Sequence, residues 1–137
     1  MNESTVIRIQ VPEHQRTTTT AEQFGFNFSR RIEPFVFAMA EEMGHEYRGG
    51  LWQFFQLSNG GFYMAPDFDT LFTVSCENEF SGPMSADALG ITACLYAYSH
   101  LSFGQGDFAE TCSRHYHWLR EYMMDHPEAR NILRAID

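Results

Sequence analysis

The chain has 137 residues, of which 44% are apolar and 15% aromatic, and it carries a formal net charge of -9. A chain of this length buries roughly 68% of its unfolded surface, so we expect a single domain spanning residues 1–137 with its own core. The aromatic content excludes a disordered acidic tail. The sequence has neither an apolar run of ~20 residues nor the pattern of a signal peptide, so we expect a cytoplasmic protein without a membrane partner.

The negative charge bears on two kinds of DNA-related protein. Domains that bind nucleic acid by neutralising phosphates are basic, so strong nucleic-acid binding is not expected. A protein that imitates DNA faces a quantitative problem, because a compact chain of this length is roughly 37 Å across and a duplex that long carries about 22 charges. One face would need about as many carboxylates as the 18 in the whole chain. Bulk charge mimicry is therefore a poor explanation of the acidity.

The N-terminal third contains one predicted strand and one predicted helix. Residues 5–11 alternate between apolar and polar side chains, which predicts a short strand. Residues 12–25 have no clear periodicity, and the run Thr17–Thr20 predicts a loop or an exposed extended segment. Apolar residues at helical spacing predict a helix over Ile32–Met43, which Gly44 is placed to end.

The middle of the chain reads as a sheet. Leu51–Leu57, Phe62–Ala65 and Leu71–Cys76 are apolar runs bounded by turn residues, and Asn59–Gly60 is a hairpin signal between the first two. These runs predict an antiparallel three-stranded meander. The strand over residues 5–11 adds a fourth strand if it pairs with them.

The C-terminal part is predicted to be helical over residues 85–102, 107–124 and 127–136. Ser85 is suited to cap the first of these helices. Apolar residues surround that helix almost completely, so it should be central, and Gly90 within it indicates close approach of a neighbouring backbone. The fold class is therefore α+β, with the sheet packed against about four helices.

No set of nucleophile, base and orienting group emerges from the spacing, so we expect no catalytic residue, no metal site and no cofactor. Cys112 and His115, three apart on a helix, are the only ligand-like pair. Simple packing explains them better. A small metal-dependent hydrolase that uses this pair remains the alternative.

Two surface features suggest partner binding instead. The turn at Asn59, Gly60 and Gly61 is flanked by Trp52 and Tyr63, and aromatic rings are common anchors in interfaces.

At the other end of the chain, Asp137 ends the last helix. An acid there is electrostatically unfavourable, which suggests that the residue is kept for contact.

An ordered set of short segments resembles the ArdB/KlcA antirestriction protein family. The segments are Tyr47–Trp52, Ser58–Pro66, Phe80–Gly82, Ser85–Ile91, Tyr116–Arg120, His126–Glu128 and Ala135–Asp137. Polar residues within these segments are further candidates for partner binding: Ser85, Asp87, His126 and Glu128.

The resemblance implies a protein of plasmids, phages or genomic islands that relieves restriction of incoming DNA by type I restriction–modification enzymes. It also implies a protein that is neither an enzyme nor a charge mimic of DNA. The expected partner is the type I enzyme, reached directly or through a host factor. An acidic DNA mimic and the metal-dependent hydrolase stay as alternatives, and the sequence leaves the oligomeric state open.

Overall fold

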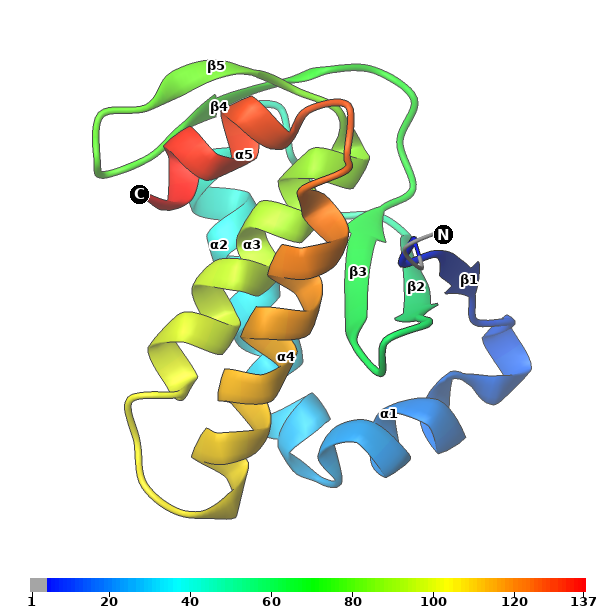
Figure 1. Ribbon diagram of the computed structural model, residues 1–137. Helices are drawn as coiled ribbons and strands as arrows, with labels where there is room; N and C mark the ends of the chain where they lie inside the picture. The colour runs from blue at the N-terminus through cyan, green and yellow to red at the C-terminus, as the bar shows by residue number, and fades with distance from the viewer. Residues whose placement is uncertain (1–4) are drawn as a thin grey trace.

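The computed structural model describes residues 5–137 (Figure 1). The strands are β1 (Arg8–Gln10), β2 (Trp52–Leu57), β3 (Phe62–Pro66), β4 (Phe72–Ser75) and β5 (Ser81–Met84). The α-helices are α1 (Arg16–Phe24), α2 (Glu33–Met43), α3 (Ala86–Leu101), α4 (Asp107–Met123) and α5 (Ala129–Ile136). A 3-10 turn, η1 (Glu13–Gln15), precedes α1, and a π-helix, η2 (Phe28–Ile32), leads into α2. Within the described residues, no helix combines the length and apolar character needed to cross a membrane.

Helix α3 is the centre of the molecule, as predicted. It contacts β3 on one side and α2, α4 and α5 on the others, and twelve of its sixteen residues are buried (Figure 1). The Ser85 side chain accepts a hydrogen bond from the Ala88 amide and so caps the helix. The buried Thr92 hydroxyl donates to the Ala88 carbonyl at 2.8 Å, so no hydroxyl is left unpaired at this point in the core.

Gly90 lets α3 approach strand β3 closely. A Cβ atom placed on Gly90 would lie 2.5 Å from the Cα of Ala65 and 2.5 Å from the carbonyl oxygen of Met64. Such distances are far inside van der Waals contact, so only glycine lets the helix approach β3 this closely. This confirms the close approach predicted at Gly90.

The three-stranded antiparallel sheet is present, but its membership differs from the predicted meander. The order is β1-β2-β3, so the N-terminal strand takes the edge position, and the predicted β2–β3 hairpin is confirmed. The predicted third strand, β4, pairs instead with β5 in a separate sheet. Phe72 and Val74 are buried, and Val74 forms a bridge to Gly44 at the end of α2. The position of β4 is therefore determined by burial of its apolar residues against the helices. It does not pair with β3, the strand that precedes it in the sequence.

Helix α1 corrects the prediction of a loop or extended segment at Thr17–Thr20. Threonine is a weak helix former, but tertiary packing overrides this preference. Thr19, Thr20 and Phe24 are buried, and the Thr20 hydroxyl donates to the Arg16 carbonyl at 2.9 Å. The helix is therefore stabilised by its packing on the rest of the protein.

Candidate functional site

A network of polar side chains lies where β1, β3, the first turn of α3 and the connection from α4 to α5 meet. Asp87 is at its centre. Its Oδ1 accepts hydrogen bonds from Arg8 Nη1 at 2.6 Å and from the Tyr63 hydroxyl at 2.7 Å. Its Oδ2 lies 2.8 Å from His126 Nε2. We call Arg8, Tyr63, Asp87 and His126 the Asp87 network.

Each member is positioned by its secondary structure. Asp87 occupies the first turn of α3, where the helix dipole favours a carboxylate. Tyr63 projects from β3, and its ring stacks on Phe55 with centroids 5.0 Å apart. Arg8 projects from β1, and its guanidinium lies 4.2 Å from the centre of the Phe55 ring. Strands β1 and β3, on either side of β2, thus hold the arginine and the tyrosine against the same carboxylate.

A second layer of hydrogen bonds ties the network to α5. His126 Nδ1 accepts from the Glu128 amide at 2.9 Å. The Glu128 carboxylate accepts from the Ser85 amide at 2.9 Å and also from the Ser85 hydroxyl. The start of α3 and the start of α5 are therefore held together through three side chains.

The protonation states in the network are fixed. Burial alone would raise the pKa of Asp87, but hydrogen bonds from His126 and Tyr63 and the Arg8 charge outweigh it and lower that pKa. Burial, followed by the Asp87 charge, raises the pKa of Tyr63. At neutral pH the network therefore holds an ionised aspartate, a charged arginine and a neutral tyrosine.

The hydrogen bonds of His126 define the tautomer of its ring. An amide N–H can only donate, so His126 Nδ1 carries no proton and Nε2 carries one, which it donates to Asp87. Both ring nitrogens are thus engaged inside the protein. The network presents fixed charges at the surface, since the Arg8 side chain is 42% exposed and that of Asp87 26%.

The predicted turn Asn59–Gly61 is docked on α4 rather than free. Asn59 Nδ2 donates to the Trp118 carbonyl and to Glu121 Oε1, both at 2.9 Å. A Cβ on Gly61 would lie 2.9 Å from the Trp118 Cβ, so this glycine permits close packing.

The two aromatic residues that flank this turn, Trp52 and Tyr63, are 5% and 0% exposed. Neither ring forms an anchor on the outer surface.

Asp137 is exposed and lies apart from the Asp87 network. It borders a small hollow beside the β4–β5 turn, together with Asn78, Phe80 and Arg134. Asn78 Nδ2 donates to the carbonyls of Arg134 and Ala135 at 2.9 and 3.0 Å, which satisfies the end of α5.

Cys112 and His115 are both buried and form no reactive pair. Burial raises the pKa of the Cys112 thiol to about 11 and lowers that of His115 to about 4. The His115 ring is packed against Phe24 and Trp118, with centroids 4.5 and 5.1 Å away. In the part of the chain that the structure describes, no three metal-ligating side chains are grouped to hold an ion. Both side chains are packed in the interior of the protein.

The depressed pKa of His115 predicts a loss of stability in mild acid. The unfolded chain takes up a proton at this residue near pH 6.5, whereas the folded protein does so only near pH 4. The free energy of unfolding should therefore fall as the pH falls, with about 1.5 kcal/mol lost through this group between pH 6.5 and pH 5. Urea unfolding of the wild type and of His115→Phe at both pH values measures this loss. An equal loss in the variant would contradict the assignment.

Five of the predicted site residues thus come together around Asp87: Tyr63, Ser85, Asp87, His126 and Glu128. Arg8 was missed as a site residue because the strand pattern marked it only as an outward polar position. It lies 79 residues from Asp87 in the chain, and no local signal connects them.

The fold has a counterpart among known proteins. Residues 45–137 match the family model described as antirestriction protein, and the chain belongs to that family. The predicted family and the α+β fold class are thereby confirmed.

Individual relatives extend the likeness to nearly the whole chain. YafX, an uncharacterized protein of Escherichia coli K12, is 43% identical over 93% of this chain and 85% of its own length. The antirestriction protein KlcA of Escherichia coli is 38% identical over 93% of this chain and 92% of its own length. A solved structure matches with a TM-score of 0.90 and 38% identity, covering 100% of both chains. It comes from a study of KlcA and ArdB, which show a novel fold and antirestriction activity against type I DNA restriction systems in vivo but not in vitro.

Proposed function

We propose that this protein relieves type I restriction of incoming DNA by binding a protein in the cytoplasm. The partner is the restriction enzyme itself or a host factor that the enzyme depends on. The observation that carries the proposal is the match to the KlcA and ArdB structure over the full length of both chains.

The activity described for KlcA and ArdB occurs in vivo but not in vitro. A protein that simply occupied the DNA-binding site of the enzyme would also inhibit the purified enzyme. The difference supports a mechanism that needs a cellular component, so we favour the host factor over direct contact.

The carboxylates of this chain also argue against charge mimicry. Several of them already accept hydrogen bonds from the protein itself: Asp87 from Arg8, Glu128 from Ser85, Glu46 from Thr73 and Glu121 from Asn59. An imitation of a duplex needs carboxylates that are free to meet the enzyme's basic groups.

The Asp87 network supplies a better contact surface. Its exposed arginine is held in one geometry by a strand, a ring and a carboxylate. Holding a charged group in one position before binding reduces the entropy lost when a partner engages it. Because its histidine and tyrosine are engaged or neutral, we assign the network to binding and not to catalysis.

Plating of an unmodified phage on a type I restricting strain, with and without the expressed protein, tests the function. We expect more plaques when the protein is present and an unchanged capacity of the strain to methylate the phage DNA. Equal plaque numbers would contradict the proposal.

Cleavage by the purified type I enzyme in the presence of the purified protein separates the two mechanisms. We expect no inhibition. Inhibition that weakens as salt is added would favour the DNA mimic.

A further inference from the structure

Strand β1 lies at one edge of the three-stranded sheet, where it pairs with β2 alone (Figure 1). Antiparallel strands bond to each other through alternate residues. On this side of β1 the Ile7 carbonyl accepts from the Ser58 amide at 2.9 Å, and the Val11 amide donates to the Phe54 carbonyl at 2.8 Å. Ile9, midway between Ile7 and Val11, has the same orientation toward β2.

The outer edge of β1 therefore carries a row of unpaired main-chain groups, the N–H and the C=O of Arg8 and of Gln10. Within residues 5–137, no group of the protein forms a hydrogen bond to them from the outer side. All three residues of the strand are exposed, so these groups are accessible. Such a row is a template for one further strand.

The side chains beside this row are apolar on one face of the sheet. Ile7 and Ile9 are 55% and 60% exposed, and they lie on the same face because they are two residues apart. Exposed β-branched side chains at an edge pack well against the side chains of a neighbouring strand. This face of the edge therefore favours a segment with apolar residues at alternate positions.

The one charged residue of β1 does not protect the edge. Natural edge strands are often protected from pairing by a charged side chain. The Arg8 guanidinium lies on the other face of the sheet from Ile9, 4.2 Å from the centre of the Phe55 ring, and its Nη1 donates to Asp87. The charge of Arg8 is thus balanced within the protein and held away from the path of an incoming strand.

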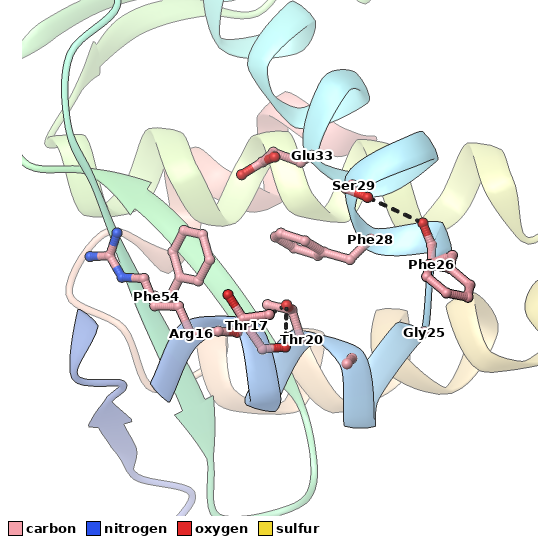
Figure 2. Close-up of a pocket in the computed structure, with 10 residues that line it drawn as sticks. Arg16, Thr17, Thr20, Gly25, Phe26, Phe28, Ser29, Glu33 and Phe54 are labelled. Atoms are coloured by element: carbon pink, nitrogen blue, oxygen red, sulfur yellow. Dashed lines mark hydrogen bonds between the residues drawn. The ribbon is translucent and has the colours of Figure 1, made fainter. Parts of the chain in front are cut away.

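The chain that follows β1 leaves the edge open. Helix α1 begins at Arg16, whose Nη2 donates to the Trp52 carbonyl at 2.8 Å. Figure 2 shows Arg16 beside Phe54 at a cavity of about 560 Å³, and the guanidinium lies 4.6 Å from the centre of the Phe54 ring. Because these contacts tie the start of α1 to β2, the helix does not cover the outer side of β1 (Figure 1).

We propose that β1 binds an extended segment of a partner protein, which adds to the sheet as a further antiparallel strand. Two residues of the segment exchange main-chain hydrogen bonds with Arg8 and Gln10, and the residue between them packs on Ile9. An extended backbone matches this edge because its alternate N–H and C=O groups complement those of β1. The inference deepens the proposed function and rests on it, since it states how a protein partner engages the surface beside the Asp87 network.

A second copy of this chain fits the edge less well. Each copy carries a net charge of -9, so two copies repel each other. A stable dimer buries about 1,200–2,000 Å², whereas an edge of three residues is only about 10 Å long. A separate extended segment avoids both obstacles, because it need not be acidic and a transient contact needs less area.

Amide NMR spectra of the ¹⁵N-labelled full chain, titrated with the capped peptide Lys-Val-Thr-Val-Thr-Val-Lys, test the proposal. In the proposed register the central valine lies opposite Ile9, and the two threonines lie opposite Arg8 and Gln10. We expect the peptide to shift the amides of Arg8 and Gln10 with a Kd of order 1 mM, a range typical of a single weak contact.

Two N-methylated forms of the peptide are the matched controls. Methyl groups on both threonine nitrogens replace the N–H groups that face β1, so this form should leave the spectrum unchanged. A methyl group on the central valine nitrogen lies on the side away from β1, so this form should bind as the unmodified peptide does. All three peptides carry the same charge, so attraction to the acidic protein cannot account for a difference between them.

Two variants complete the test. Ile9→Lys should weaken binding at least about tenfold, because a charge replaces an apolar contact at the edge. Leu71→Lys adds the same charge at an apolar position that is 63% exposed and lies just before β4, and it should bind as the wild type does. The spectra of the variants show directly that each is folded.

Equal binding of the two methylated peptides, unchanged binding by Ile9→Lys, or no shift up to about 10 mM peptide would overturn the proposal. Sedimentation that shows a dimer dependent on Ile9 would also overturn it, because a second copy would then occupy the edge. Phage plating with the wild type tests the proposed function without any peptide, so the two proposals can fail separately.

Discussion

Gly90→Ala should destabilise the protein by about 3 kcal/mol or more, at the upper end of the cost of overpacking a core. The added methyl group would lie 2.5 Å from the backbone of Ala65 and Met64. Both neighbours belong to β3, so neither can move without shifting the sheet against α3. The resulting repulsion exceeds the gain of about 1 kcal/mol that alanine brings to a helix interior. Urea unfolding followed by circular dichroism at 222 nm measures the change.

Gly104→Ala is the matched control. A Cβ at Gly104 has a single neighbour within 4 Å, the Leu101 carbonyl oxygen at 3.7 Å, and the residue is exposed. The urea concentration at the unfolding midpoint of Gly104→Ala should equal that of the wild type within error. A Gly90→Ala protein that unfolds at the same urea concentration as Gly104→Ala would show that α3 does not depend on this contact.

Asp87→Asn should cost about 2 kcal/mol at pH 7, since it removes the charge that three donors share and leaves polar groups poorly paired. The amide can still accept from Arg8 and Tyr63 through its oxygen. Its NH₂ group, however, would face the N–H of His126 Nε2, so two donors would meet. Rotating the amide or changing the tautomer of His126 only moves the mismatch to another member of the network.

The same variant has a defined pH dependence. The pKa of Asp87 is lower in the folded protein than in the unfolded chain. The stability it contributes is therefore present above the unfolded value near pH 4 and is lost as the pH falls through the folded value. The difference between wild type and Asp87→Asn should shrink from pH 7 to about pH 3. Asp69→Asn, an exposed acid of the β3–β4 loop, is the control and should match the wild type at both pH values. A difference that stays constant with pH would argue against an ionised Asp87.

The sequence predicted those parts of the fold that local patterns encode. The central helix, its Ser85 cap and Gly90, the end of α2 at Gly44 and the β2–β3 hairpin all follow from periodicity or turn chemistry within a few residues. Helix α1 was missed because its threonine run has low helix propensity and is stabilised only by distant contacts such as Phe24 with Tyr98.

Strand β5 was missed for a related reason. Gly82 and Pro83 are poor strand residues, and the segment is extended because it pairs with β4.

The candidate site could be predicted only in part. Asp87, His126 and Glu128 were candidates because they lie in segments that resemble the family. Their meeting at one carboxylate depends on how α3 packs against β3 and α5, which no local pattern encodes. The burial of Trp52 and the docking of Asn59 on α4 follow from the same tertiary packing.

The plating efficiency of an unmodified phage on a type I restricting strain that expresses Arg8→Ala tests the central claim most directly. Arg8 is partly exposed, so its loss should lower stability by less than about 1 kcal/mol, and a loss of protection would then reflect a lost contact. Arg30→Ala removes the same charge from an exposed position of η2 and is the control. We predict that the Arg8→Ala variant protects the phage at least about tenfold less than the wild type does, as expected for the loss of a charged group at an interface. The Arg30→Ala variant should protect as fully as the wild type does. Full protection by a folded Arg8→Ala protein would contradict the assignment of the Asp87 network as the partner-binding surface.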